Sequence, residues 1–289
     1  MLFLVLAALQ SPVAERTGVF QSPRVLESSG VAASRAHPGV LWTHNDSGDG
    51  PYLYATDIRG RDLGALLVRN AEAHDWEAIA LGPCPRAAGT GDCVFIGDTG
   101  DNSEDRFGVT VYAVREPDPP TAPADTQRVT CAPAVLRLRY PDGPHDVEAI
   151  YVSPQDSTLY LVSKGRSGPV RLYRVGGEGW AADTVLTATL VQVLPVEPDP
   201  SAGRWITDAA MRGDGGLVAL RTQAEIYFFT PGAGGRLHRA GRPTCRIRGL
   251  EYQGEAIDFL RDGTLVLTSE ADGPKRPGQI HVVRCPDDD

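Results

Sequence analysis

The sequence has 289 residues, of which 42% are hydrophobic, and this is enough to bury a large core within one domain. A formal net charge of −9 and a pI near 5.2 exclude a general nucleic-acid or anionic-membrane surface, because such surfaces need clustered lysine and arginine. The 32 glycines and 23 prolines, with 7% aromatic residues, favour many short strands joined by tight turns over long helices.

The chain begins with the apolar run MLFLVLAA, followed by polar and small residues. This order is typical of the hydrophobic region and cleavage zone of a secretory signal, and the run is too short to span a bilayer. The positive charge that usually precedes such a run is missing, so an apolar, frayed N-terminus is the alternative. We predict a signal peptide over 1–14, a secreted or periplasmic protein without a membrane span, and a single domain over 18–286.

The cysteines also bear on the compartment, because disulfides persist in oxidising environments. Cys84 and Cys93 bracket the loop PRAAGTGD and can close a small disulfide there. Cys131, Cys245 and Cys285 leave one cysteine unpaired however they pair. Buried free thiols in outer strands are an equally good interpretation of these three.

Five segments repeat one order of features: a small or acidic residue, an apolar strand, a polar turn, a second apolar strand, a polar loop and a third strand. The repeats start at Ser29, Glu77, Glu148, Asp208 and Glu255. Second strands are predicted from Val40, Cys93, Leu159, Leu217 and Leu265, and third strands from Tyr52, Val109, Val170, Glu225 and Gln279. Outer strands with one solvated face are predicted at ALLV, AVLRLRY, TLVQVL and TCRIR.

Four strands in each of five repeats are typical of an all-β protein, a β-propeller with five antiparallel blades. The last repeat lacks a fourth strand, and residues 18–26 can supply it and close the ring. Six blades are the alternative if the long interval between Glu77 and Glu148 hides two repeats. The Pro-rich stretch EPDPPTAPAD in that interval favours a long surface loop instead. We expect a monomer.

In a propeller the innermost strands begin and the second strands end at the same face, so the repeat starts and the loops after the second strands converge there. These loops are HNDSGDG, GDTGDNSEDR, SKGRSG, RTQAE and TSEADG. We therefore predict the functional site at this face. The turns between first and second strands, such as SPQDST and RDGT, indicate ordinary hairpin chemistry.

Carboxylates brought together around one narrow axis either raise each other's pKa or require a counter-cation. Calcium meets that requirement, because it takes about six to eight hard oxygen ligands. We predict a Ca²⁺ ion held by Ser29, Glu77, Glu148, Thr207, Asp208 and Glu255. The alternative is a hydrated tunnel in which these carboxylates pair with amides or basic side chains.

An open coordination position beside a base would allow water to be activated, and the residues predicted for that role are His74, Asp75, Asp98 and Asp101. A small anionic substrate is expected to contact His44, Asn45, Asp46, Lys164, Arg166 and Arg221. His74 and the matching His145 can instead reflect duplicated blade packing, and the basic residues can simply balance the acidic ring. The sequence contains no nucleophile elbow, phosphate loop or dinucleotide fingerprint.

The order Ser29, Glu77, Glu148, Thr207-Asp208 and Glu255 at the starts of innermost strands resembles the five-bladed calcium-activated nucleotidases, which are apyrase-like. The resemblance implies a central calcium held by a Ser, Glu, Glu, Ser, Glu ring. This chain departs from the pattern at its fourth position, and its loops do not match the nucleotide-contacting loops of the family. The segments ESSGVAAS, WTHNDSG, HDWEAIA, GDTGDN and GEAI also resemble exported bacterial propellers of unassigned activity.

Three functions are compatible with these patterns. The first is a calcium-dependent hydrolase of a phosphorylated or ester substrate. The second is a non-catalytic propeller that binds a ligand or a protein and uses calcium structurally. The third is a lactonase-like enzyme, similar to calcium propellers with a Glu and Asn ligand set. Propellers host all three classes, so the fold does not choose among them.

Overall fold

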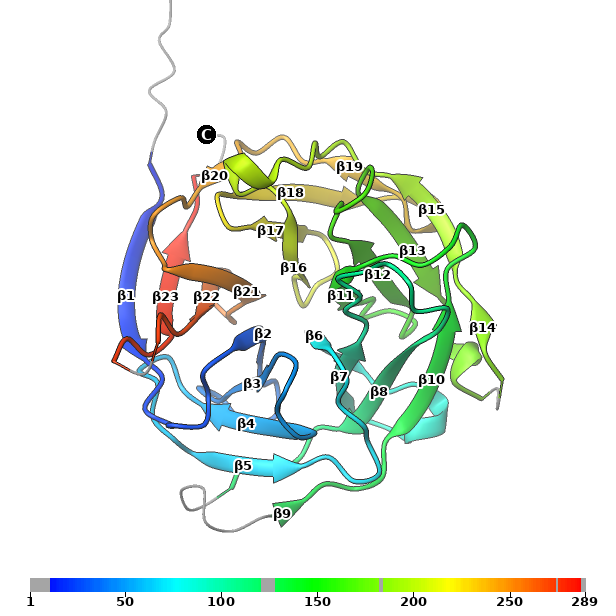
Figure 1. Ribbon diagram of the computed structural model, residues 1–289, viewed down its shortest axis with the longest axis horizontal. Helices are drawn as coiled ribbons and strands as arrows, with labels where there is room; N and C mark the ends of the chain where they lie inside the picture. Colours follow the sequence, from blue (N-terminus) through cyan, green and yellow to red (C-terminus); the bar gives the residue numbers. More distant parts are fainter. Residues whose placement is uncertain (1–10, 121–127, 182–183, 274, 287–289) are drawn as a thin grey trace, which may run out of the picture.

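The computed structural model describes residues 11–120, 128–181, 184–273 and 275–286. Five mainly antiparallel sheets stand around a central axis as blades, each with its first strand innermost (Figure 1). The predicted five-bladed, all-β propeller is confirmed. The six-bladed alternative is wrong, because the interval between Glu77 and Glu148 contains the rest of one blade and no additional one.

The blades follow the chain order, and their strands are as follows. Blade 1 contains β2 (Ser28–Ala33), β3 (Leu41–Asn45), β4 (Tyr52–Thr56) and β5 (Gly64–Leu67), with β9 (Arg128–Val129) parallel beside β5. Blade 2 contains β6 (Trp76–Pro83), β7 (Asp92–Asp98), β8 (Val109–Arg115) and β10 (Ala134–Arg139), with β14 (Leu186–Thr187) parallel beside β10. Blade 3 contains β11 (Val147–Val152), β12 (Leu159–Ser163), β13 (Arg171–Val175) and β15 (Thr189–Val193).

Blade 4 contains β16 (Ile206–Met211), β17 (Val218–Thr222), β18 (Glu225–Pro231), β19 (Leu237–Arg239) and β20 (Cys245–Arg246). Blade 5 contains β21 (Gln253–Phe259), β22 (Leu265–Glu270), β23 (Gln279–Arg284) and β1 (Val13–Val19). Short 3₁₀ turns occupy η1 (Arg86–Ala88), η2 (Gly177–Ala181), η3 (Pro200–Ala202) and η4 (Ala233–Gly235). No helix in the described ranges is long and apolar enough to cross a membrane.

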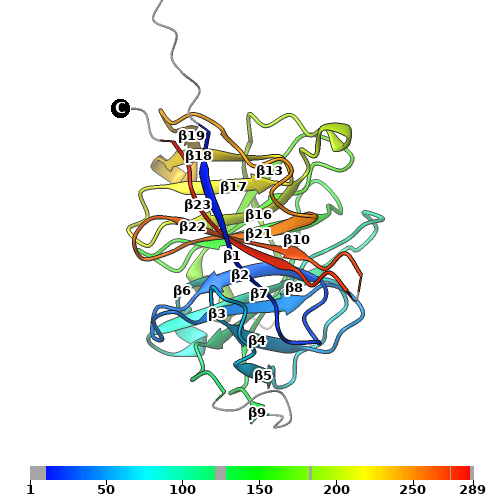
Figure 2. The same ribbon diagram turned by 90° about the vertical axis from the view of Figure 1, so that its left-hand side faces the viewer.

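The N-terminal strand closes the ring, as predicted, but it lies earlier in the chain than residues 18–26. β1 pairs with β23 from Val13 to Val19, and the two strands run side by side in Figure 2. The residues after Val19 form turns that include Pro23, and a proline has no N–H for a strand ladder. Residues 1–10 of the predicted signal segment lie outside the described residues, whereas Val13 and Ala14 belong to β1.

The outer strand of blade 4 also differs from the prediction. TCRIR was expected to form it, but β19 and β20 both pair with β18, at opposite ends of that strand. Pro243 lies between the two segments and cannot donate to a ladder, which explains why the outer strand is divided.

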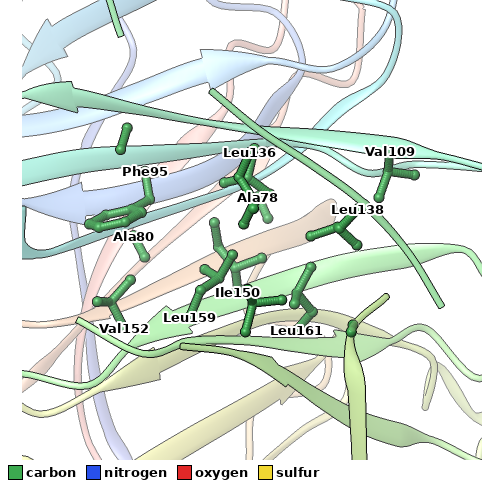
Figure 3. Packing of buried hydrophobic residues seen from close by; sticks show 14 of the residues in the cluster. Ala78, Ala80, Phe95, Val109, Leu136, Leu138, Ile150, Val152, Leu159 and Leu161 are labelled. Atoms are coloured by element: carbon green, nitrogen blue, oxygen red, sulfur yellow. The ribbon is translucent and has the colours of Figure 1, made fainter. Parts of the chain in front are cut away.

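Neighbouring blades are held together by apolar side chains that pack face to face. Ala78 and Phe95 of blade 2, for example, share one buried cluster with Ile150 and Leu161 of blade 3 (Figure 3). The innermost strands lie between two such clusters, so both of their faces are buried, and β11 (VEAIYV) is buried at every position. This rigid packing fixes the position of the residues at the strand ends.

Two disulfides brace the described chain. Cys84–Cys93 closes the β6–β7 turn as predicted. Cys245–Cys285 links β20 of blade 4 to the residue that follows β23 of blade 5, so the free-thiol interpretation is wrong for this pair. Cys131 is the free cysteine among these residues, and it is exposed, not buried.

Candidate functional site

A β-bulge interrupts every innermost strand at the same place, one or two residues after the strand begins. The register with the second strand shifts at five residues: Ser29, Glu77, Glu148, Thr207 and Glu255. A bulge re-aims a side chain out of the regular ladder, and bulges are over-represented beside active sites. The repeated bulge therefore gives one equivalent position per blade, and in blade 4 that position belongs to Thr207.

Blades 1 and 2 bring three carboxylates together at this face. One oxygen from each of Asp46, Asp75 and Glu77 lies within 4.8 Å of the other two. Ser29 Oγ donates a 3.0 Å hydrogen bond to Glu77 Oε2, so the bulge residues of the two blades are in direct contact. Asp46 comes from the loop after β3, and Asp75 from the connection that enters β6. Hard oxygen atoms grouped in this way suit a divalent cation.

The electrostatics of this cluster show negative charge that is not fully compensated. Burial, reinforced by the charges of Asp46 and Asp146, raises the pKa of Asp75 to about 7. Burial, with Asp46 and Asp75 nearby, also raises the pKa of Glu77 well above its usual value. Crowded carboxylates either hold protons or attract a cation, and either event lowers the negative charge of this cluster.

Blade 3 contributes its own positive charge. The Lys164 ammonium contacts the Glu148 carboxylate, and its Nζ lies 3.8 Å from Asp146 Oδ2. Arg166 Nε donates to Asp146 Oδ2 at 2.9 Å. Lys164 therefore neutralises Glu148, the bulge residue of blade 3, as in the tunnel interpretation. Asp46, Asp75 and Glu77 form no ion pair with any residue in the described ranges.

Blades 4 and 5 complete the ring. Thr207 Oγ1 is buried and has no hydrogen-bond partner within the described residues. Gln223 Nε2 donates to Glu255 Oε1 at 3.2 Å. Burial and the neighbouring Glu255 and Asp46 raise the pKa of Glu270 to about 8. An unpartnered buried hydroxyl on this ring is a further oxygen available to a ligand.

Asp208 lies one residue beyond the bulge, and its carboxylate bonds to the backbone. Its Oδ1 accepts from Ala209 N at 2.7 Å, and its Oδ2 accepts from Ile257 N of blade 5 at 2.8 Å. The side chain is fully buried. Oδ2 thus ties β16 to β21, Oδ1 bonds within β16, and the ring position in blade 4 is that of Thr207.

The predicted water-activating residues form a connected group. Asp98 accepts from the backbone N–H groups of His74 and Asp75 at 3.3 and 3.2 Å, from the His74 ring Nδ1 at 3.2 Å, and from Arg106 Nη2 at 2.9 Å. The His74 side chain is 64% exposed, and its Nε2 has no partner in the described chain. Asp101 instead caps its own loop by accepting from the backbone N–H of residues 105 and 106.

Three of the predicted substrate contacts face the interior. His44 is buried against Trp76, with ring centroids 5.9 Å apart, and burial lowers its pKa. Asn45 bonds to the backbone of residues 24, 26 and 27 and so fastens the segment before β2. Arg221 is fully buried, with its guanidinium bonded to Glu251 and to the carbonyls of residues 256 and 268.

The solvent-facing rim carries cations over an aromatic ring. The Arg166 guanidinium lies 4.8 Å and the Lys164 ammonium 5.7 Å from the centre of the Trp205 ring. Arg166 also donates to Asn102 Oδ1 from the loop after β7. Cations held on an aromatic face beside a carboxylate cluster can hold the anionic part of a substrate.

His74 and His145 occupy matching positions in the sequence, yet they differ in the structure. His145 is buried, lies 3.3 Å from Asp142 and stacks on Tyr173 with centroids 5.9 Å apart. It therefore packs within blade 3, in agreement with the packing interpretation. Blade packing therefore explains the position of His145 but not that of the exposed His74.

Four residues of this site were not among the predicted site residues: Asp146, Trp205, Gln223 and Glu270. Asp146 precedes Glu148 by two residues, as Asp75 precedes Glu77, so the repeat offset could have identified it. Glu270 lies in the loop TSEADG that was assigned to this face. Gln223 likewise lies in the loop RTQAE that was assigned to this face. Trp205 has no such signal, because single aromatic residues near a strand end are common in any propeller.

Comparison with known proteins supports the fold. No family model matches the chain, and no curated protein matches it. Among solved structures, a glucose dehydrogenase is similar with a TM-score of 0.51 and 11% identity over 95% of this chain and 100% of that one. A Xanthomonas campestris gluconolactonase has a TM-score of 0.47 and 13% identity, covering 97% and 92% of the two chains. An auxiliary nutrient binding protein from Bacteroides thetaiotaomicron has a TM-score of 0.48 and 8% identity, covering 95% and 77%.

Proposed function

We propose that this chain is an exported, calcium-dependent hydrolase of small anionic esters, either phosphate esters or carboxylic esters including lactones. The observation that supports it is the carboxylate cluster of Asp46, Asp75 and Glu77, whose oxygens lie within 4.8 Å of one another. The raised pKa values of Asp75 and Glu77 express an excess of negative charge that a divalent cation would relieve. Ser29 supplies a neutral oxygen beside it, and Thr207 has an unpartnered hydroxyl at the equivalent position of blade 4.

The ligand set in this proposal is Asp46, Asp75 and Glu77, with Ser29 in contact with Glu77. When bound, calcium would polarise the carbonyl or phosphoryl oxygen of the substrate. Arg166, whose guanidinium lies over the Trp205 ring, would hold the anionic group of the substrate at the rim. The same guanidinium orients the ester toward the carboxylate cluster.

His74 is the general base in this mechanism, because Asp98 orients its ring through Nδ1 and leaves Nε2 facing solvent. Nε2 accepts a proton from water as the water oxygen attacks the ester. The bond from the carbonyl carbon or phosphorus to the leaving oxygen then breaks. The imidazolium returns its proton to the departing alkoxide, so acid and alcohol are released and the histidine is restored.

Export is part of the proposal, and the two disulfides support it, because such bonds persist in oxidising compartments. A signal peptidase that leaves the closing strand intact would cut before Val13, since β1 begins there. We propose that the secreted or periplasmic chain is a monomer.

Hydrolysis is tested with p-nitrophenyl acetate, p-nitrophenyl phosphate, bis(p-nitrophenyl) phosphate and a lactone, with calcium and then with a chelator. We expect calcium-dependent cleavage of at least one substrate. His74→Gln should lower kcat by about 100-fold or more and leave calcium binding unchanged. The matched control is His238→Gln, an exposed histidine on β19. Equal activity of His74→Gln and wild type would refute the assigned base.

A non-catalytic binding propeller is the second candidate. It is favoured by Asp101 and Asn45, whose side chains brace loops by bonding to backbone groups. Calcium binding without cleavage of any substrate in the panel would select this function over the hydrolase.

A further inference from the structure

A cavity of about 440 Å³ opens at the face opposite the carboxylate cluster. Its wall is formed by three turns, those between β2 and β3, between β16 and β17, and between β21 and β22, together with Leu81 of β6. The innermost strands begin at the carboxylate cluster and end at these turns, so the cavity and the cluster lie at opposite ends of the same strands. A volume of this size is typical of sites for small molecules.

Three arginines from three different blades line the cavity. Arg212 pairs with Asp214 of its own turn at 2.9 Å. Arg35 lies 3.6 Å from Asp92, a carboxylate that is not part of the cavity wall. Arg261 donates to the backbone carbonyl of Arg35 and forms no ion pair with the described residues. Arg35 and Arg261 thus line the same cavity, and Arg261 has no carboxylate partner among the described residues.

The other carboxylate of the cavity wall, Asp258, accepts hydrogen bonds from the backbone. Asp258 Oδ2 accepts from Ala33 N, and its Oδ1 accepts from Phe259 N, both at 2.7 Å. Burial raises the pKa of Asp258 to about 6, so this residue offers less negative charge than an exposed aspartate. The cavity thus carries more positive than negative charge in a chain whose net charge is −9.

Part of the cavity wall is apolar. Leu81, Met211 and Phe259 line the cavity. Toward the axis, the space lined by Val31 and Tyr151 has a volume of only about 10 Å³, which holds at most one water molecule.

We propose that this cavity binds a small organic anion with a compact apolar body. The anionic group is a carboxylate or a phosphate held by Arg35 and Arg261, whose planar guanidinium groups suit both chemistries. The apolar body lies against Leu81, Met211 and Phe259. The site stands apart from the proposed hydrolytic centre and does not depend on it.

Binding is tested by NMR titration of the full chain with benzoate, phenyl phosphate and benzyl alcohol, which share one ring and differ in charge. We expect saturable binding of benzoate, phenyl phosphate or both, and at least tenfold weaker binding of the neutral alcohol. The anion that binds more tightly identifies the anionic group.

Variants localise the site. Arg261→Gln replaces an exposed residue and should weaken anion binding at least tenfold. The double variant that combines Arg35→Gln with Arg261→Gln should also weaken it at least tenfold. Arg16→Gln makes the same change of charge on the exposed outer strand β1 and should bind like wild type. Three results would overturn the proposal: no saturable binding of either anion, equal binding of the alcohol, or unchanged binding by both cavity variants with retained melting temperatures.

Discussion

Thr207 and Asp208 are adjacent in β16, but their side chains have opposite surroundings. Asp208 satisfies two buried backbone N–H groups, whereas Thr207 Oγ1 has no protein partner in the described residues. Asp208→Ala should lower the free energy of unfolding by about 3 kcal/mol, since it leaves both donors unsatisfied. Thr207→Val should change it by less than about 0.5 kcal/mol. Urea denaturation of both variants measures the contrast, and similar losses would contradict it.

Asp258 makes stability depend on pH. Its folded pKa of about 6 exceeds the usual 3.8, so the folded state binds more protons between about pH 4 and 6. The free energy of unfolding should therefore fall as pH rises through this window. We expect a fall of about 2 kcal/mol from this residue, because the cavity leaves part of the side chain in contact with solvent.

Denaturation of wild type and Asp258→Asn at pH 4 and pH 7 isolates this contribution. The amide does not titrate, so the stability of wild type relative to the variant should decrease at the higher pH. A difference between the two proteins that is the same at both pH values would show that Asp258 does not titrate as described.

Residue roles were only partly predictable from the sequence. The carboxylates at Glu77, Glu148 and Glu255 follow from the repeat, because equivalent positions in equivalent blades meet at one face. The choice between Thr207 and Asp208 depends on which residue is bulged, and a bulge shifts register by one residue without a reliable mark in the sequence. The burial of Arg221 depends on Glu251, a partner 30 residues away.

At the level of elements, the closing strand depends on a close approach between backbones. Gly60, with φ of 77°, lies so near β1 that an added Cβ would be 1.8 Å from the carbonyl oxygen of Val19. Gly60→Ala should therefore cost about 3 kcal/mol or more and loosen β1. Gly39 also has a positive φ, 88°, but open space around it, so Gly39→Ala should cost about 1 kcal/mol.

Thermal melts and hydrogen exchange of β1 amides compare the two glycine variants. Faster exchange of residues 13–19 in Gly60→Ala alone is the expected result. Equal destabilisation by both substitutions would mean that the backbone angle, and not the contact with β1, sets the cost.

The positions of most inner strands could be predicted from alternating patterns and apolar runs in the sequence. The positions of the edge strands could not. β1 and the divided outer strand of blade 4 are edge elements, whose positions depend on proline placement and on the partner strand more than on their own pattern. Inner strands buried on both faces have a stronger signal, which explains why four of the five repeat starts match the bulge positions and the fourth in chain order, Asp208, is only one residue away from its bulge position.

At the scale of the whole molecule, Cys245–Cys285 links blade 4 to the end of blade 5 across 40 residues. A loop of this length corresponds to about 4 kcal/mol of chain entropy, against roughly 2.5 kcal/mol for the 9-residue separation of Cys84–Cys93. Replacing both cysteines of the longer loop by alanine should therefore lower the melting temperature more than the same change at Cys84 and Cys93. Calorimetry of both double variants tests the order, and a reversed order would contradict it.

The number of blades was predictable because repetition is a property of the entire chain and tolerates irregular loops. The cavity opposite the carboxylate cluster could not be predicted from the sequence. It is built from turns such as RDGT, which are ordinary hairpin turns when taken singly, and only the ring brings Arg35, Arg212 and Arg261 to one opening.

Isothermal titration of the metal-free protein with calcium tests the central claim most directly. We expect saturable binding by wild type and by Asp105→Asn, an exposed aspartate on the same face, and at least about tenfold weaker binding by Glu77→Gln. No saturable calcium binding by wild type, or equal affinity of Glu77→Gln and wild type, would contradict a metal site at Asp46, Asp75 and Glu77.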